Sequence, residues 1–321
     1  MTQKKVLGFG LNLTALANCD LAALERMLAT YAEIGCSHVE VSARRLDMIA
    51  GGRIVEERAE AVAEILARHS MTPVLHANHA INFMDRPNHA MHWAVAEASV
   101  RLAGRMNMPS IVIHSGHVPV DVWLASKKSL ITEEREDLKR LSDLAGEAGT
   151  RLALENLIAD PRGRKVCSGA DPRAVGEQII AVDHPALGGC LDFGHAFLSA
   201  PVLGFDFLAA VSDFSEAVWH LHLHDNCGIP DTGAIGDSGD QVAFGVGDLH
   251  MPMGWGRIPW EEVLPAMRLR NGTFAMIELQ GRYRGVEAMV ADAARRFMDY
   301  WNGSIDLDAA LGGKAHREAA Q

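Results

Sequence analysis

The sequence has little cysteine and no long apolar run. Its 321 residues include only five cysteines, Cys19, Cys36, Cys167, Cys190 and Cys227, with no C-x-x-C pair among them. An odd, scattered set argues against a disulfide framework and favours a reducing compartment, so we expect a cytoplasmic protein. No stretch approaches the roughly 20 apolar residues of a membrane-spanning helix. The apolar run after the N-terminal lysines is too short for a signal peptide, so we expect no membrane association.

Positive charge is also scarce. The chain has 30 Lys and Arg against 41 Asp and Glu, a net charge of −11, and its basic residues form no stripe. Non-specific nucleic-acid and anionic-membrane surfaces depend on clustered Lys and Arg, so both kinds of partner are disfavoured. A dinucleotide-binding domain lacks support as well, because no G-x-G-x-x-G motif opens a helical segment. Hydrophobic residues make up 48% of the chain, which is typical of a globular protein with a full core.

Short apolar runs alternate with longer helical patterns along the chain. The runs that resemble strands are 6–11, 38–43, 73–77, 111–116, 151–156, 187–194, 218–225 and 274–280. The helix-like segments are 20–34, 54–69, 88–106, 133–146, 171–181, 205–216, 260–270 and 286–301. Strict alternation predicts parallel strands with right-handed crossovers, and eight such units favour a closed (β/α)8 barrel of the α/β class. We expect one barrel domain over residues 1–302 and a polar, flexible tail over 303–321. Two long loops, 157–170 and 227–258, are candidates for functional lids.

The most unusual stretch is Trp-His-Leu-His-Leu-His-Asp-Asn at 219–226. Side chains alternate between the two faces of a strand, so His220, His222 and His224 share one face and the leucines occupy the other. Any one of these histidines could be a hydrogen-bonded core residue. Three imidazoles on one buried face nevertheless predict that at least one of them serves a functional site.

Reactive residues also end the other predicted strands. They are Glu40, Ser42, His76, His114, His117, Glu155, Asn156, Asp192, His195, Glu278 and Gln280. In a barrel the active site forms at the C-terminal ends of the strands, so these side chains are expected to meet there. Buried carboxylates are costly without partners, and a divalent cation would neutralise several at once. Two Glu, one Asp and one His suit Mn²⁺, Mg²⁺ or Co²⁺, and each added imidazole favours Zn²⁺. Spacing alone leaves the choice between His222 and His224 open.

Four motifs, in chain order, carry a family resemblance. They are Leu154-Glu155-Asn156, Leu191-Asp192-Phe193-Gly194-His195, His222-Leu223-His224-Asp225 and Ile277-Glu278-Leu279. From residue 6 to about 301, the chain resembles the xylose isomerase-like TIM-barrel superfamily, which includes sugar isomerases, ketose 3-epimerases, inosose dehydratases and endonuclease IV. The resemblance implies metal ligation by Glu155, Asp192, His222 and Glu278. Its His-x-x-Asp pattern selects His222 over His224.

The resemblance also implies a reaction. The expected enzyme is a metal-dependent isomerase or epimerase of a sugar, keto-polyol or sugar phosphate, working through a metal-stabilised enediolate. Glu155 and Glu278 are the implied acid and base pair. Loss of a β-hydroxyl from the same intermediate would instead make a dehydratase of an inosose-type substrate. The expected partner is a small-molecule sugar or polyol, and a homo-oligomer is left open.

A second reading comes from a fuller ligand set. Five further positions resemble those that endonuclease IV uses to hold three zinc ions: His76, His114, His195, Asp248 and His250. They are candidates for additional metal or for substrate binding, and the alternative function is a multi-zinc phosphodiesterase acting as an AP endonuclease. However, His79-Ala80 stands where the repair enzymes carry a bulky wedge, a poor pair for opening a duplex. With the acidic balance of the chain, this disfavours a nucleic-acid substrate.

Two further residues are weaker candidates for substrate binding. Arg282, just past Glu278, could hold a carboxylate or phosphate, although a solvated loop charge is an equally good reading. Trp255 could wall the site off from solvent, although single aromatic residues more often belong to the core. A barrel that has lost turnover and serves as a binding subunit is a third class, which the intact ligand set opposes.

Overall fold

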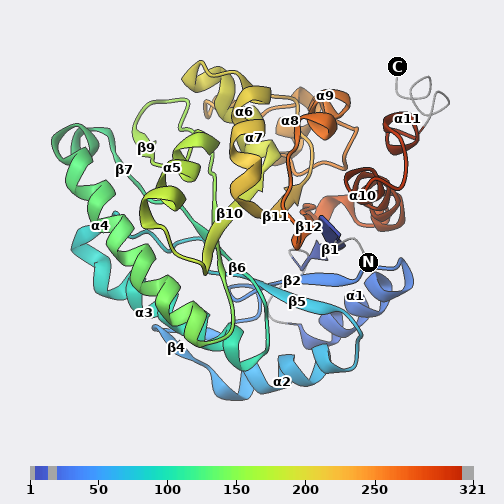
Figure 1. The fold of residues 1–321 in the computed structure, drawn as a ribbon, viewed down its shortest axis with the longest axis horizontal. Helices are drawn as coiled ribbons and strands as arrows, with labels where there is room; N and C mark the ends of the chain where they lie inside the picture. The colour runs from blue at the N-terminus through green and yellow to red at the C-terminus, as the bar shows by residue number, and fades with distance from the viewer. Residues whose placement is uncertain (1–3, 14–19, 313–321) are drawn as a thin grey trace.

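The computed structural model describes residues 4–13 and 20–312 and confirms the predicted barrel. Eight parallel strands close on themselves in the order β1-β12-β11-β10-β8-β6-β5-β2 (Figure 1). Their bounds are β1 Val6–Asn12, β2 His38–Ser42, β5 Thr72–His76, β6 Ile111–His114, β8 Leu152–Glu155, β10 Leu187–Asp192, β11 Val218–Leu223 and β12 Thr273–Ile277. Each of the eight predicted strand segments overlaps one of these strands.

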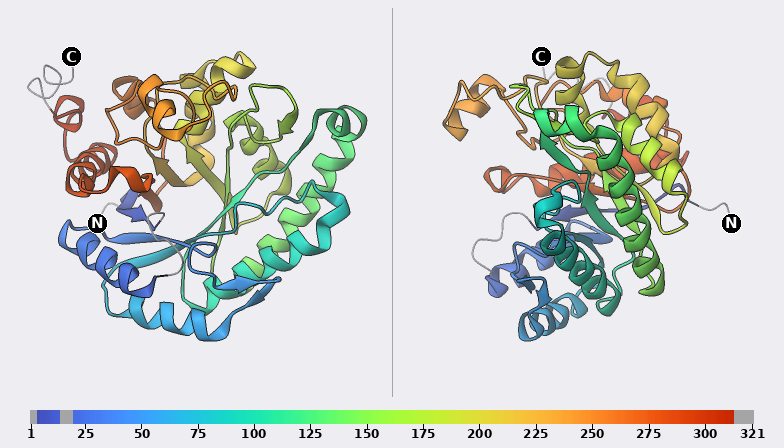
Figure 2. Two further views of the ribbon diagram at one scale, coloured as in Figure 1. Left: turned by 180° about the vertical axis from the view of Figure 1, so that it is seen from behind. Right: turned by 90° about the vertical axis from the view of Figure 1, so that its left-hand side faces the viewer.

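Helices surround the barrel on its outside (Figures 1 and 2). They are α1 Leu21–Glu33, α2 Glu56–Ala67, α3 His89–Arg105, α4 Val120–Glu147, α5 Pro172–Val182, α6 Phe193–Leu203, α7 Phe207–Phe214, α8 Ser238–Phe244, α9 Trp260–Ala266, α10 Glu287–Trp301 and α11 Leu307–Ala310. Short 3-10 turns lie at Arg86–Asn88, Ser215–Ala217 and Gly281–Tyr283. Among the described residues, no helix is both long and apolar enough to span a bilayer.

Strand β11 shows how the alternating sequence builds the barrel. Leu221 and Leu223 are fully buried and belong to the main hydrophobic cluster, which packs the strands against the outer helices. Burial of each such leucine is worth roughly 1.5–3 kcal/mol. His220 and His222, on the other face, lie inside the barrel and meet the carboxylate of Glu40. The predicted division of this strand between imidazoles and leucines is therefore confirmed for these residues.

The structure corrects several predicted boundaries. Helix α4 begins at Val120, whereas the sequence predicts a helix over 133–146. Its first turns expose Val122 and Leu124, so burial imposes no helical period on that part of the sequence. The predicted strand 187–194 ends at Asp192, and α6 starts at once, with Asp192 as its N-cap. This helix is apolar on most sides and contains Pro201, and both features hide it from a periodicity analysis.

The long loops and the C-terminal segment contain more structure than their sequences indicate. The loop 157–170 contributes β9 (Lys165–Cys167), which pairs with β7 (His117–Pro119), and β3 (Ile49–Ala50) pairs with β4 (Arg53–Ile54). The loop 227–258 carries α8 and stands out from the barrel in Figure 2. In the segment predicted as a flexible tail, α11 packs on α10 and buries Ala310. Residues 313–321 lie outside the described residues, so flexibility there stays a prediction.

The described cysteines, Cys36, Cys167, Cys190 and Cys227, are all free thiols. Cys19 lies outside the described residues. These four cysteines therefore form no disulfide framework.

Candidate functional site

The four predicted metal ligands converge at the C-terminal end of the barrel. Donor atoms of Glu155, Asp192, His222 and Glu278 all lie within 4.8 Å of one another, and all four residues are buried. His222 Nδ1 is the centre of this group: it lies 3.0 Å from Glu155 Oε1, 3.5 Å from Glu278 Oε2 and 3.7 Å from Asp192 Oδ2. We call these four residues the central group. Parallel strands end at one rim, which is why residues far apart in the sequence meet here.

Glu40, at the end of β2, fixes the orientation of His222. Its Oε2 accepts hydrogen bonds from His222 Nε2 at 3.1 Å and from His220 Nε2 at 3.0 Å. Because a carboxylate only accepts, Nε2 of His222 carries a proton and Nδ1 is the atom turned toward the central group. Glu40 is noted in the sequence as a strand-end residue, but nothing there reveals its partner on the other side of the barrel.

Electrostatics at this point favour a positive charge. Burial lowers the pKa of His222, but Cys190 and the carboxylates of Glu278, Glu40 and Glu155 outweigh it and hold that pKa well above its usual value. Positive charge on the imidazole is therefore stabilised by the surrounding anions. The same surroundings would stabilise a bound cation at this place.

The two glutamates of the central group differ in proton affinity. Burial raises the pKa of Glu278, the nearby charge of Glu40 adds to this, and His222 only partly opposes it. Burial also acts on Glu155, but the charge of His222, its hydrogen bond to Glu155 Oε1 and the nearby imidazole of His114 outweigh it and hold the pKa of Glu155 well below its usual range. Paired carboxyl groups whose pKa values are pushed apart are suited to act as acid and base.

A second donor group consists of His76, His114 and Glu155. Nε2 of His76 lies 3.4 Å and Nε2 of His114 lies 3.3 Å from Glu155 Oε2. This buried oxygen makes no well-aligned hydrogen bond, so the two imidazoles face it without satisfying it. His76 directs Nε2 toward it because its Nδ1 donates to Ala77 O at 2.9 Å. The arrangement is typical of donors that can share an ion.

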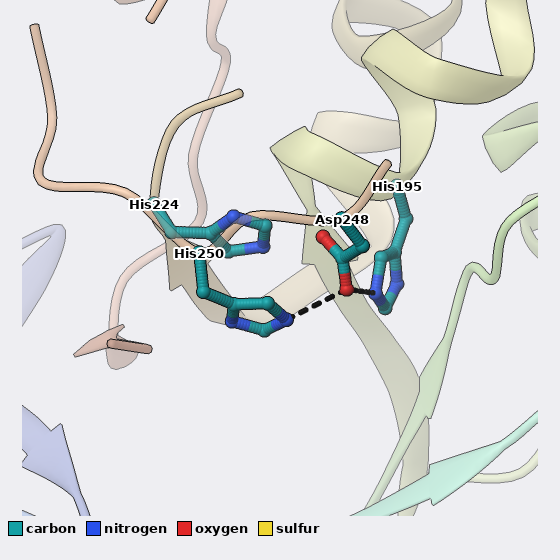
Figure 3. A group of neighbouring side chains, drawn as sticks. All are labelled: His195, His224, Asp248 and His250. Atoms are coloured by element: carbon teal, nitrogen blue, oxygen red, sulfur yellow. Dashed lines mark hydrogen bonds and ion pairs between the residues drawn. The ribbon is translucent and has the colours of Figure 1, made fainter. Parts of the chain in front are cut away.

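A third donor group consists of His195, His224, Asp248 and His250 (Figure 3). Asp248 lies between two imidazoles, with its Oδ2 2.7 Å from His250 Nε2 and 3.5 Å from His195 Nε2. The rings of His224 and His250 stack at 4.0 Å. Asp248 Oδ1 is buried and has no hydrogen-bond partner among the described residues. His250 has a φ of 43°, a left-handed conformation that is uncommon for a residue with a side chain and that often marks functional sites.

His224 joins this third group, which the sequence does not anticipate. Its Nε2 lies 3.0 Å from each carboxylate oxygen of Asp192, so Asp192 connects the third group to the central one. The His-x-x-Asp pattern assigns only His222 to a metal, and the geometry places His222 in the central group. The sequence does indicate that His224 faces the site, because side-chain alternation puts it on the same face of the strand as His222.

Asp225, the last residue of the His-x-x-Asp motif, holds the loop 227–258 in place through hydrogen bonds and does not face the donor groups. Its buried carboxylate accepts hydrogen bonds from the backbone N–H groups of Gly254 at 2.8 Å and Ile258 at 3.1 Å, and from the indole of Trp260 at 3.1 Å. A Cβ on Gly256 would lie 2.2 Å from this carboxylate, so only glycine fits there. Asp225 thus holds the loop that carries Asp248 and His250.

A cleft of about 660 Å³ opens above the three donor groups. The lining residues that are buried or half-buried form its floor: His76, His114, Glu155, His195, Asp248, His250 and Glu278. The exposed lining residues His79, Arg44, Arg45 and Arg282 form its mouth. The charge of His76, burial and the charge of His114 lower the pKa of His79 to about 3, and Arg44 adds to this effect. A neutral His79 imidazole therefore faces the cleft at neutral pH.

The two weaker sequence candidates differ in position. Arg282 lines the cleft, and so do Arg44 and Arg45, which the sequence analysis does not single out. Trp255 is 50% exposed and packs edge-on against Tyr283 instead of lining the cleft.

Comparison with known proteins agrees with this architecture. The family described as xylose isomerase-like TIM barrel matches residues 28–301, whereas no curated protein matches the chain. A D-tagatose 3-epimerase-like protein has a TM-score of 0.67 at 18% identity, with 92% of this chain and 97% of that one covered. The IOLI protein with a bound zinc atom has a TM-score of 0.66 at 16% identity, with 92% and 98% covered. A xylose isomerase-like TIM-barrel protein from Mycobacterium smegmatis, in complex with magnesium, has a TM-score of 0.62 at 15% identity, with 95% and 100% covered.

At these identities the solved structures show the shared fold alone. The family match spans most of the sequence, and it agrees with the resemblance carried by the four strand-end motifs. The chain therefore belongs to the xylose isomerase-like TIM-barrel family.

Proposed function

We propose that this chain is a divalent-metal-dependent isomerase or epimerase of a sugar, keto-polyol or sugar phosphate, acting in the cytoplasm. The observation that supports this most is the pair Glu155 and Glu278, two buried carboxyl groups in one donor group whose pKa values are displaced in opposite directions. The fold it shares with a D-tagatose 3-epimerase-like protein is consistent with the proposal.

The residues of the central group fit a divalent cation. Three carboxylates and one oriented imidazole converge within 4.8 Å, and Glu155 Oε2 is a buried oxygen without a hydrogen-bond partner among the described residues. Such a set suits Mn²⁺, Mg²⁺, Co²⁺ or Zn²⁺. When bound, the ion would supply Lewis acidity that polarises a substrate carbonyl and stabilises the charge of an enediolate.

The residues of the chain would then move the proton. Glu155, ionised at neutral pH because its pKa is low, is the better acceptor of a proton from the carbon next to the carbonyl. Glu278, whose pKa is raised, is the better donor that returns it. Return to the neighbouring carbon gives an isomerase, and return to the opposite face of the same carbon gives an epimerase.

His195 would orient the substrate. Its Nδ1 donates to Asn156 O at 2.9 Å, which directs Nε2 toward the cleft. Because Nε2 also lies 3.5 Å from Asp248, the imidazole is placed to hydrogen-bond a substrate oxygen at the boundary of the central and third groups.

The test is a panel of ketoses, aldoses, inososes and their phosphates, each assayed with Mn²⁺, Mg²⁺, Co²⁺ and Zn²⁺. We expect turnover with exchange of a substrate C–H proton for solvent deuterium. Glu155→Gln should lower kcat by at least about 10²- to 10⁴-fold, the usual contribution of a positioned acid or base, because it also removes a ligand of the proposed metal. Asp137→Asn is the matched control, because Asp137 is a buried carboxylate that pairs with Arg86 and His89 away from the cleft. A folded Glu155→Gln variant with full activity would rule out the assignment.

One observation favours a second candidate, a multi-zinc phosphodiesterase. The second and third donor groups flank the central one, and both are rich in imidazole, which Zn²⁺ prefers. Metal analysis distinguishes the two candidates, since about one ion per chain supports the isomerase and about three support the hydrolase. Product analysis on an inosose would identify the dehydratase, the third outcome of the same chemistry.

A further inference from the structure

The mouth of the cleft is basic, although the chain as a whole is acidic. Three arginines, Arg44, Arg45 and Arg282, line the mouth, whereas the net charge of the chain is −11. The acidic residues that line the same cleft, Glu155, Asp248 and Glu278, belong to the donor groups at its floor. The cleft therefore has carboxylates paired with imidazoles at its floor and guanidinium groups at its exposed mouth.

Arg44 is one of the minority of arginines in the described parts of the chain that form no ion pair. Most of the others form ion pairs with carboxylates: Arg26, Arg68, Arg86, Arg101, Arg105, Arg140, Arg162, Arg164, Arg173, Arg268, Arg295 and Arg296. Within residues 4–13 and 20–312, Arg44 forms no ion pair and no hydrogen bond through its guanidinium. It lies two residues after β2, on a turn in which Leu46 N donates to Ser42 O, so its backbone is held near the C-terminal end of that strand.

Arg282 is held in place but its charge is not neutralised. Its Nη1 donates to Ser238 O at 2.9 Å, which ties the guanidinium to the segment that carries α8. No carboxylate of the described residues lies within ion-pair distance of it. A guanidinium fixed by one hydrogen bond keeps its remaining donors in a planar array that matches a carboxylate or phosphate.

We propose that Arg44 and Arg282 bind an anionic group, phosphate or carboxylate, at the end of the substrate remote from the reacting carbons. The substrates are then sugar phosphates or sugar acids, and neutral sugars are poor substrates. This rests on the proposed isomerase or epimerase activity of the same cleft. The carboxylates at the floor are already paired with imidazoles, whereas the guanidinium groups of Arg44 and Arg282 have no carboxylate partner among the described residues, so an anionic group is best compensated where these arginines line the cleft.

The experiment compares matched compounds that differ in the anionic group. For the metal-loaded enzyme, kcat/KM is measured for D-fructose, D-fructose 6-phosphate and D-fructuronate, and for D-ribulose and D-ribulose 5-phosphate. The wild type is expected to prefer the anionic member of a set, and whether phosphate or carboxylate is preferred identifies the group. Arg44→Gln and Arg282→Gln should each reduce the anionic-to-neutral ratio of kcat/KM by about 10- to 100-fold, the usual effect of a hydrogen bond to a charged group.

The control is Arg53→Gln, because Arg53 is exposed on β4, makes no ion pair among the described residues and lies outside the cleft. The anionic-to-neutral ratio of kcat/KM for this variant should equal that of the wild type. Neutral sugars turned over as well as the anionic ones, with ratios unmoved by Arg44→Gln and Arg282→Gln, would overturn the anion site and leave the isomerase proposal standing.

Loss of the proposed function gives a different result. If no compound is turned over with any metal, that function fails, and calorimetric binding of D-fructose and D-fructose 6-phosphate decides the anion site alone. Tighter binding of D-fructose 6-phosphate that weakens in both cleft variants supports the site. Absent binding, or binding that the variants leave unchanged, refutes it.

Discussion

Replacing Glu40 by Gln should weaken metal binding without any direct change to the central group. Glu40 is buried inside the barrel, and its Oε2 accepts hydrogen bonds from both His220 and His222. Glutamine removes the negative charge, and a neutral carbonyl oxygen in place of Oε2 is a weaker acceptor for both imidazoles. His222 then loses part of the force that fixes its orientation and makes Nδ1 a basic ligand atom.

The magnitude follows from the role of such supporting carboxylates. Loss of an outer hydrogen-bond partner of a metal-ligating histidine lowers metal affinity by about 10- to 100-fold. This corresponds to about 1.4 to 2.8 kcal/mol of binding free energy. Glu40→Asp, which keeps the charge on a shorter side chain, should lie between Glu40→Gln and the wild type.

The assay is a competition titration of Zn²⁺ or Mn²⁺ against a chelator of known affinity, with circular dichroism to confirm folding. Asp137→Asn, a buried charge neutralised on α4, serves as the control and should leave the affinity unchanged. A folded Glu40→Gln variant that binds the metal as tightly as the wild type would show that Glu40 does not support His222.

Other predictions concern stability. Burial raises the pKa of Glu134 to about 7, so the folded state holds this proton more tightly than the unfolded chain does, and stability falls as pH rises from about 4.5 to about 7. Glu134→Gln should remove this loss, so that between about pH 4 and pH 8 the free energy of unfolding of the variant rises by about 3 kcal/mol relative to that of the wild type, as measured by urea unfolding at several pH values. Parallel pH profiles of the two proteins would contradict the assignment. Asp225→Ala leaves several buried donors unpaired and should lower the free energy of unfolding by about 3 kcal/mol, with Asp225→Asn less severe. Metal at 100 times its Kd should stabilise the folded chain by about 2.7 kcal/mol, and an unchanged melting temperature would argue against a site that binds only the folded state.

The sequence predicts the barrel and the central group because both depend on local patterns. Alternation of apolar runs and helical segments determines the order of the elements, and parallel strands then bring their last residues to one rim. Glu155, Asp192 and Glu278 each end an apolar run, where a carboxylate is expensive unless it has a use. The chemistry of these positions is therefore visible before the structure is known.

Other parts of the site depend on contacts that no local pattern encodes. Glu40 and His222 lie far apart in the sequence and meet only across the closed barrel. Arg44 looks like an ordinary surface charge until the cleft shows what it faces. Helix α6 starts at a residue that also ends a strand, since Asp192 both faces His222 and accepts a hydrogen bond from His195 N at 2.7 Å. A reading of the sequence that assigns one element to each segment extends the strand past Asp192 and misses the helix that Asp192 caps.

The sharing of carboxylates between donor groups leads to a prediction that separates the two candidate functions. Glu155 belongs to both the central and the second group, whereas Asp248 belongs only to the third. If the chain holds about three ions, Asp248→Asn should remove about one of them and Glu155→Gln about two, because Glu155 uses a different oxygen toward each group. If the chain holds about one ion in the central group, Glu155→Gln should remove it and Asp248→Asn should leave the metal content unchanged. Metal analysis of the two folded variants by mass spectrometry measures this directly. Equal losses in both variants would contradict the division into three groups, because the side chains would then have to act as one site.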